Sequence, residues 1–278
     1  MIATVFPTIQ YKYGQTFRIK PCFDWHFGHR YCDLRALKAY ISNGYDDENC
    51  YVVGGGDIAD SILPVDKRYR KSSDGLGEGD AAINYIQDGL TEMFLPYKGR
   101  ILGLGLGNHE DTVLKKSGVH IIRELCRRLE CKSLGYQWAI TLNFSENGNR
   151  GHKIVIFGQH GWGGGTRTEG GSITKYSKHA LYWDADIFFY GHDHRLEHHV
   201  IPFMGIRGEQ YLPKNKHIIL PGTFLRTFSK TDEPTWAETR GFHPAPLQGT
   251  DLYIKFSGRG FGMKIWSDTT GSQPKEEA

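Results

Sequence analysis

The stretch Cys50-Tyr51-Val52-Val53-Gly54-Gly55-Gly56-Asp57-Ile58-Ala59-Asp60 joins an apolar run to a glycine turn that is followed by two carboxylates. Two later stretches repeat this arrangement, because Ile154–Phe157 precedes His160 and Ile187–Tyr190 precedes His192. Short uninterrupted apolar runs of this kind indicate buried parallel strands, and polar residues just beyond their carboxyl ends meet at one edge of a sheet. The pattern therefore predicts that residues far apart in the chain lie together in space.

Five polar clusters follow one another along the chain. They are Asp24-Trp25-His26, Gly56-Asp57-Ile58-Ala59-Asp60, Gly107-Asn108-His109-Glu110, His160 and Gly191-His192-Asp193-His194. Each alone is a weak signal, since Gly-Asp is a common turn dipeptide and a single histidine after a strand is more often structural. In this order the clusters resemble the motif of the calcineurin-like metallophosphoesterase superfamily, D-x-H, G-D-x-x-D, G-N-H-[DE], H and G-H-x-H. The resemblance covers roughly residues 16–225.

The resemblance implies a centre with two divalent transition-metal ions. Two such ions, about 3.5–4 Å apart, produce a bridging hydroxide that attacks the phosphorus atom, and they hold the oxygens of the reacting group. Imidazole, carboxylate and amide oxygen without thiolate suit catalytic Mn²⁺, Fe²⁺/Fe³⁺ or Zn²⁺, and ligand type does not choose among these metals. The implied ligands are Asp57 as the bridge, Asp24, His26 and His194 on the first ion, and Asn108, His160 and His192 on the second.

His109 directly follows the implied ligand Asn108, but the family pattern does not use it as a metal ligand. We expect it beside the scissile group, as a general acid to the leaving oxygen or as a cationic stabiliser. Asp60 and Glu110 are candidates for orienting His109 or a metal-bound imidazole. The alternative, given equal weight, is that each of the two is a solvated carboxylate in a turn. Asp193, between two ligands, is interpreted as a spacer.

The residues after Asp60 bear on the substrate. Protein phosphatases of the Ser/Thr type carry Arg-Gly where this chain has Ser61-Ile62, so that branch is disfavoured and the motif looks more like the phosphodiesterase and nuclease branches. The stretch from His160 to Asp186 also looks similar to phosphoesterases of phage genomes. We expect a phosphodiester substrate, in nucleic acid or a nucleotide. The alternatives are a phosphomonoesterase acting on a small molecule or phosphoprotein, and a non-catalytic binding scaffold.

Candidate substrate contacts are histidine and cationic side chains near the motifs. The run Lys67–Lys71 interleaves four cations with an aromatic ring, as binders of phosphate backbones do, and a solvated loop is the simpler alternative. Arg167 lies in a glycine-rich segment that follows His160 and could approach a phosphate closely. The full set is His29, Lys67, Arg68, Arg70, Lys71, Arg167 and Arg226.

Composition sets further limits. The chain of 278 residues has 34 basic and 31 acidic residues, so its formal net charge of +3 gives no overall preference for polyanions. Five cysteines without a C-x-x-C pair indicate reduced thiols. The first residues lack the features of a signal peptide. A segment that crosses a bilayer needs about 20 apolar residues, and no apolar stretch of the chain is that long. We expect a cytoplasmic enzyme without membrane attachment.

Periodicity predicts helices near 34–41, 81–95, 121–129 and 174–183. Strands are predicted at 17–23, 50–55 and 101–106, and then at 137–142, 153–157, 186–190, 197–203, 217–220, 251–256 and 262–266. Alternating strands and helices followed by strand-rich sequence predict an α/β (α+β) fold of two packed mixed sheets flanked by helices, which the resemblance also implies. We expect one domain over 1–267, with a surface insertion at 63–80 and a frayed polar tail at 268–278.

Overall fold

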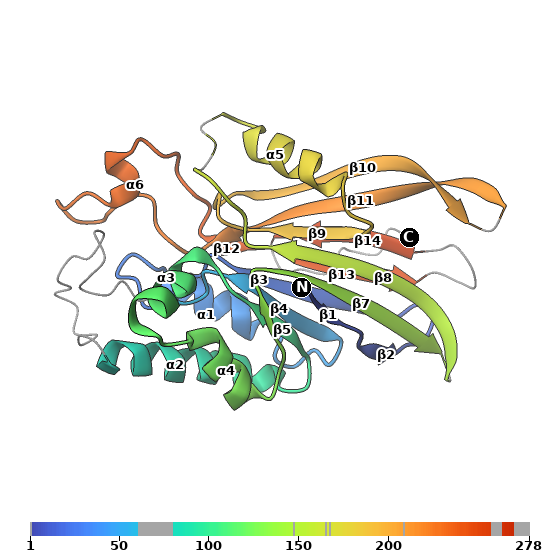
Figure 1. Ribbon diagram of the computed structural model, residues 1–278, viewed down its shortest axis with the longest axis horizontal. Helices are drawn as coiled ribbons and strands as arrows, with labels where there is room; N and C mark the ends of the chain where they lie inside the picture. The colour runs from blue at the N-terminus through green and yellow to red at the C-terminus, as the bar shows by residue number, and fades with distance from the viewer. Residues whose placement is uncertain are drawn as a thin grey trace.

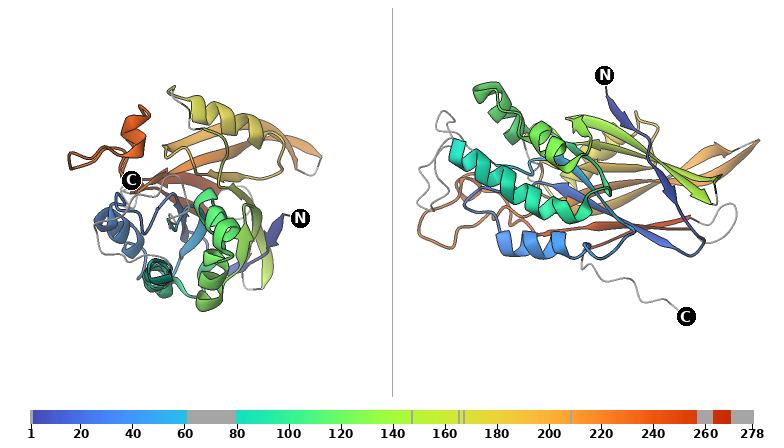
Figure 2. Two further views of the ribbon diagram at one scale, coloured as in Figure 1. Left: turned by 60° about the vertical axis from the view of Figure 1, so that its left-hand side comes forward. Right: turned by 90° about the horizontal axis from the view of Figure 1, so that it is seen from below.

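The computed structural model describes residues 2–60, 80–146, 148–164, 166, 168–207, 209–256 and 263–269. The expected insertion at 63–80 and the expected tail at 268–278 therefore lie almost wholly outside the described residues. Figures 1 and 2 show two layers of strands stacked face to face, with helices on both outer sides. The predicted fold of two packed mixed sheets flanked by helices is confirmed.

One sheet carries the first three motif clusters. Within the described part of the chain it has six strands, in the order β14-β13-β3-β4-β5-β6. Because β3, β4, β5 and β6 are parallel, their carboxyl ends share one edge, whereas β13 and β14 are antiparallel additions. The strands are β3 (Thr16–Phe23), β4 (Cys50–Gly56), β5 (Ile101–Gly105), β6 (Ser133–Gly135), β13 (Asp251–Phe256) and β14 (Met263–Asp268).

The other sheet carries the last two clusters. Its described strands number eight, with the main order β1-β7-β8-β9-β11-β10, β2 paired to β7 and β12 paired to β11. Strands β8, β9 and β11 are parallel, and β10 and β11 form a long hairpin that extends to the right of Figure 1. The strands are β1 (Ala3–Val5), β2 (Thr8–Gln10), β7 (Gln137–Glu146), β8 (Asn149–Gln159), β9 (Ile187–Tyr190), β10 (Leu196–Arg207), β11 (Gln210–Thr223) and β12 (Gln248–Gly249).

An apolar core fills the space between the sheets. Its residues alternate along the strands, as expected where one face of each sheet is buried. Phe17, Ile19 and Val53 come from the six-stranded sheet, and Trp138 and Phe189 meet them from the eight-stranded sheet. This packing fixes the relative position of the two edges that hold the polar clusters.

Helices cover both outer faces of the sandwich. Helices α1 (Leu34–Ser42), α2 (Asp80–Phe94) and α4 (Ile121–Leu129) lie along the six-stranded sheet, as Figure 2 shows on the right. Helix α5 (Gly171–Ala180) covers the eight-stranded sheet. The remaining helices are α3 (Asn108–Ser117), α6 (Trp236–Thr239) and the 3-10 helix η1 (Leu95–Tyr97).

Two differences from the predicted elements have simple causes. The helix predicted at 174–183 is displaced, because α5 begins after Gly170, a residue in the left-handed region with φ of 72°, and ends at Ala180. Helix α3 was not predicted, since it buries only Glu110 and Val113 and so shows no apolar periodicity. It ends at Gly118, whose φ of 74° suits a helix C-terminus.

All five cysteines are free in this structure, and their reduced state stays a prediction. Among the described residues, every helix is too short or too polar to cross a membrane. The cytoplasmic location and the boundaries of the single domain stay predictions.

Candidate metal centre

Each predicted metal ligand follows the carboxyl end of a core strand. Asp24 and His26 follow β3, Asp57 follows β4, and Asn108 comes three residues after β5 as the first residue of α3. From the second sheet, His160 follows β8, and His192 and His194 follow β9. Because these strands are parallel within each sheet and the sheets pack face to face, the structure brings all seven side chains together.

Asp24, His26 and His194 form the first group. The Nε2 atoms of His26 and His194 face each other at 3.1 Å, and His194 Nε2 lies 3.6 Å from Asp24 Oδ1. Asp24 Oδ1 is buried and has no hydrogen-bond partner. Two ring nitrogens and an orphaned carboxylate oxygen directed at one point suit a cation, since each can offer a lone pair.

Asn108, His160 and His192 form the second group. Asn108 Oδ1 lies 3.0 Å from His160 Nε2 and 2.9 Å from His192 Nδ1. The other ring nitrogen of His192, Nε2, donates to the carbonyl of Gly163 at 2.5 Å. Because a neutral imidazole carries one proton, this bond leaves the Nδ1 lone pair free for a metal, in the usual arrangement around a metal-bound histidine.

Asp57 lies between the two groups. Its carboxylate belongs to one potential ligand set with His26 and His109 and to another with His160 and His192. Asp57 Oδ2 is 3.0 Å from His160 Nε2, and Oδ1 accepts a hydrogen bond from the backbone N–H of His109 at 2.9 Å. This position between two ligand sets fits a bridging carboxylate.

Electrostatics at the centre favour bound positive charge. Burial raises the pKa of Asp24 to about 8, although His160 opposes the rise. Burial would also raise the pKa of Asp57, but His160 and His109 hold it well below its usual value. For His160, burial alone would lower the pKa, yet Asp57 and Asp24 raise it to about 9. The surrounding carboxylates therefore favour a proton or a metal cation at this imidazole.

Most of these ligands have an unusual backbone conformation. Among the described residues, six that are not glycine have positive φ, and five of them are Asp24, His26, Asp57, His192 and His194, with φ of 50°, 49°, 50°, 72° and 53°. Such a conformation costs on the order of 1 kcal/mol or more per residue and persists only where the surroundings enforce it. Backbone bonds between the loops do so here, from Asp24 N to Gly56 O and from His26 N to Asp57 O.

Two motif glycines allow the loops to approach each other. Gly56 has φ of 103°, and a Cβ added there would lie 2.5 Å from the nitrogen of Gly107. A Cβ on Gly107 would lie 2.1 Å from Asp57 Oδ1. Both distances are far below a normal contact, so a side chain at Gly56 would displace the backbone of Gly107, and one at Gly107 would displace Asp57.

Asp60 and Glu110 are both buried and hydrogen-bonded, unlike solvated turn carboxylates. Asp60 accepts from His109 Nδ1 at 2.9 Å and from His26 Nδ1 at 3.2 Å. Burial opposes ionisation of Asp60, but His109 and His26 keep its pKa well below its usual value. Glu110 instead accepts three backbone N–H groups, those of Asp57, Ala59 and Gly107, each at 2.9 Å. Asp60 thus contacts two imidazoles, whereas Glu110 holds the backbone of the Asp57 loop.

The candidate substrate residues are placed less uniformly. His29 follows His26 in the same loop, its Nδ1 accepts from Tyr31 N at 3.0 Å, and burial lowers its pKa to about 4, so the ring is neutral. Arg226 forms an ion pair with Asp33, the residue that caps the start of α1. The candidates that lie outside the described residues are Lys67, Arg68, Arg70, Lys71 and Arg167.

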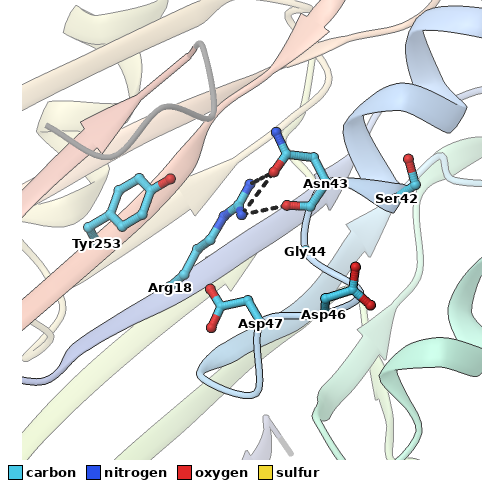
Figure 3. Close-up of a pocket in the computed structure, with 7 residues that line it drawn as sticks. All are labelled: Arg18, Ser42, Asn43, Gly44, Asp46, Asp47 and Tyr253. Carbon is cyan, nitrogen blue, oxygen red and sulfur yellow. Dashed lines mark hydrogen bonds between the residues drawn. The ribbon is translucent and has the colours of Figure 1, made fainter.

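A polar pocket lies away from this centre. It has a volume of about 450 Å³ and is lined by Arg18, Ser42, Asn43, Gly44, Asp46, Asp47 and Tyr253. Arg18 is near the start of β3 whereas Asp24 follows its end, which separates the two by about 20 Å of strand. In Figure 3 the guanidinium of Arg18 points at Asn43, and its other contacts go to Asp251, so this cation is already neutralised.

No family model matches the chain, and no curated protein matches it. Among solved structures, vacuolar protein sorting 29 from Cryptosporidium parvum is similar, with 10% identity, a TM-score of 0.42, and coverage of 91% of this chain and 98% of that one. A conserved uncharacterised protein from Streptococcus pneumoniae, described as a predicted phosphoesterase, has 12% identity, a TM-score of 0.36, and coverage of 91% and 99%. Vps29 of Entamoeba histolytica in complex with Zn²⁺ has 13% identity, a TM-score of 0.28, and coverage of 78% and 96%.

Similarities with such low identities and TM-scores carry no conclusion about activity. The chain's own motifs and architecture are more informative. In the order of its five clusters and in its two packed mixed sheets, it resembles the calcineurin-like metallophosphoesterases. The candidate metal centre lies where that resemblance implies it, at the carboxyl ends of the core strands.

Proposed function

We propose that this protein is a phosphoesterase that depends on two divalent transition-metal ions and hydrolyses phosphodiesters. The observation that carries the proposal is the convergence of imidazole, carboxylate and amide ligand atoms on both sides of Asp57, with the buried Oδ1 of Asp24 left without a hydrogen bond. When bound, the two ions would supply a nucleophile from water and neutralise charge on the phosphoryl oxygens. In this proposal the first ion would be held by Asp24, His26 and His194, and the second by Asn108, His160 and His192. Asp57 would contribute its carboxylate to both ions. Mn²⁺, iron and Zn²⁺ all suit these donors.

We assign His109 to the leaving group. Its Nδ1 donates to Asp60 at 2.9 Å, and its Nε2 lies 3.9 Å from Asp57 Oδ2, so the Nε2 edge faces the centre. A protonated ring in this position can donate to the leaving oxygen or stabilise its negative charge. The carboxylate of Asp60 favours the protonated ring, because an adjacent negative charge stabilises imidazolium.

The substrate class follows from charge near the motifs. We propose nucleic acid or a nucleotide, and the support is the cation run Lys67–Lys71, which follows Asp60 closely in sequence. Arg167, Arg226 and His29 are further candidates for contacts to the substrate. Because Arg226 is paired with Asp33, it would have to exchange this partner for a phosphate.

The test compares substrates under several metals. Purified protein with Mn²⁺, Fe²⁺ or Zn²⁺ is assayed on bis-p-nitrophenyl phosphate, p-nitrophenyl phosphate and labelled single- and double-stranded DNA, with Asp57→Ala from the same preparation as the control for contaminating enzymes. Faster hydrolysis of diesters than of monoesters is expected. Preference for the monoester would favour a phosphomonoesterase. Two bound ions without hydrolysis of any substrate would favour a binding scaffold.

A further inference from the structure

Lys175 of helix α5 contacts both loops that carry ligands from the second sheet. Its Nζ forms an ion pair with Asp193 Oδ1 at 2.7 Å and donates to the backbone carbonyl of Trp162 at 3.2 Å. The ammonium also lies over the rings of Tyr176 and Trp162, 4.4 Å and 5.6 Å from their centroids. With a side chain only 18% exposed, Lys175 is an internal link between the loops and not a solvated surface residue.

Both contacts of Lys175 are next to His192. Asp193 follows His192 directly, and its side chain is 2% exposed, with Oδ1 on Lys175 and Oδ2 without a hydrogen bond. Trp162 precedes Gly163, whose carbonyl accepts the hydrogen bond from His192 Nε2. The hydrogen bond from His192 Nε2 to Gly163 O directs His192 Nδ1 toward Asn108. Lys175 therefore restrains the chain next to the donor of this bond, through Asp193, and next to its acceptor, through Trp162.

The turn at His192 needs such restraint. His192 and His194 have φ of 72° and 53°, a conformation that residues other than glycine rarely adopt. Tyr176, also on α5, donates from its hydroxyl to Gly191 O at 2.9 Å. One helix thus holds the turn through two adjacent side chains.

We propose that Lys175 is a positioning residue for the metal ligand His192, acting through Asp193 and the carbonyl of Trp162. The proposal rests on the proposed function only in that the centre binds metal. It replaces the interpretation of Asp193 as a spacer with a defined role in which the Asp193 carboxylate fixes the turn between two ligands.

The first test measures Mn²⁺ binding by calorimetric titration, independently of activity. In Lys175→Met, which keeps the length of the side chain but lacks the charge, we expect the weaker of two binding events to lose affinity by about 10–100-fold, as is typical when a group that orients a ligand is removed. The matched control is Lys178→Met, an exposed lysine of the same helix, which should leave both affinities unchanged. Unchanged affinity in Lys175→Met would overturn the proposal.

The second test separates positioning from stability. Loss of the ammonium leaves the buried Asp193 carboxylate unpaired, so metal-free Lys175→Met should melt at a lower temperature than wild type. The double variant Lys175→Met/Asp193→Asn removes this unpaired charge, and we expect its melting temperature to recover while Mn²⁺ affinity stays low. If the melting temperature and the Mn²⁺ affinity recover together, Lys175 has only a structural role and the proposal is overturned. A wild type that binds two ions but hydrolyses nothing would refute the proposed function and leave this inference standing. A wild type that binds no Mn²⁺ would overturn both.

Discussion

Asp60 is the residue whose replacement tests the geometry of the centre most directly. Its two carboxylate oxygens each accept from an imidazole, Oδ1 from His109 Nδ1 and Oδ2 from His26 Nδ1. Because an ionised carboxylate only accepts hydrogen bonds, both Nδ1 atoms must carry a proton. The Nε2 lone pair of neutral His26 is then directed at His194, where the first ion would bind.

Asp60→Asn keeps the shape but has one acceptor and one NH₂ donor, so it can satisfy only one of the two imidazoles as they now stand. If His26 changes tautomer, its Nε2 becomes protonated and cannot bind the ion. We expect about 10–100-fold weaker metal binding, which corresponds to about 1.4–2.8 kcal/mol. If His109 is affected instead, its protonated form loses the neighbouring negative charge, and turnover of substrates with poor leaving groups should fall by up to about 10²–10⁴-fold.

The assay pairs Mn²⁺ titration with turnover at saturating Mn²⁺. Asp111→Asn is the matched control, because Asp111 lies one residue after Glu110 in the first turn of α3 and pairs only with Lys115 across one helical turn among the contacts described for it. An exposed pair of this kind contributes little, so the control should behave like wild type. Wild-type metal affinity together with wild-type turnover in Asp60→Asn would refute the assignment of Asp60 as an orienting group for either histidine.

Four further predictions concern single residues and one group of cationic residues. Asp57→Ala should lose both metal ions because this carboxylate groups with His26 on one side and with His160 and His192 on the other, and elemental analysis that still finds two ions would contradict bridging. His109→Ala should keep the ions but lower turnover by about 10²–10⁴-fold on poor leaving groups and less on activated ones, and equal losses on both would indicate charge stabilisation instead. Replacement of all four cations Lys67, Arg68, Arg70 and Lys71 by Ala should weaken cleavage of nucleic acid and leave hydrolysis of a small chromogenic diester unaffected. It should also lower the slope of log affinity against log salt by about 0.7–0.9 per lost contact. Equal effects on both substrates would mean that the loop is only solvated surface. Burial and the neighbouring His198 lower the pKa of His217 from 6.5 to about 4. The unfolded chain therefore takes up this proton first, and the free energy of unfolding falls as pH drops from about 6.5 to about 4, by at most about 1.4 kcal/mol per pH unit. His217→Gln should remove this part of the slope in urea unfolding across that range, and an unchanged slope would contradict the assignment.

The core strands were predictable from the chain alone because buried parallel strands leave short apolar runs. The strand at 251–256 and the helix at 121–129 have the predicted boundaries, and β4 extends the prediction by one residue. The short edge strands β1, β2 and β6 were not predicted, since three residues carry too little periodicity to recognise. Helix α3 was missed for the related reason that only Glu110 and Val113 of its ten residues are buried.

The sequence by itself determined which ligand atoms the centre offers and that they follow the ends of core strands. Residue type sets the donor chemistry, and strand direction sets the edge at which the donors emerge. The tertiary structure decided which groups share a partner. Asp60 serves two histidines, Glu110 holds three backbone amides, and Lys175 reaches Asp193 across 18 residues of chain. None of these pairings follows from spacing along the chain. Those of Asp60 and Glu110 depend on how the loops after β3, β4 and β5 pack at one edge of the six-stranded sheet, and that of Lys175 depends on how helix α5 packs on the loop after β9.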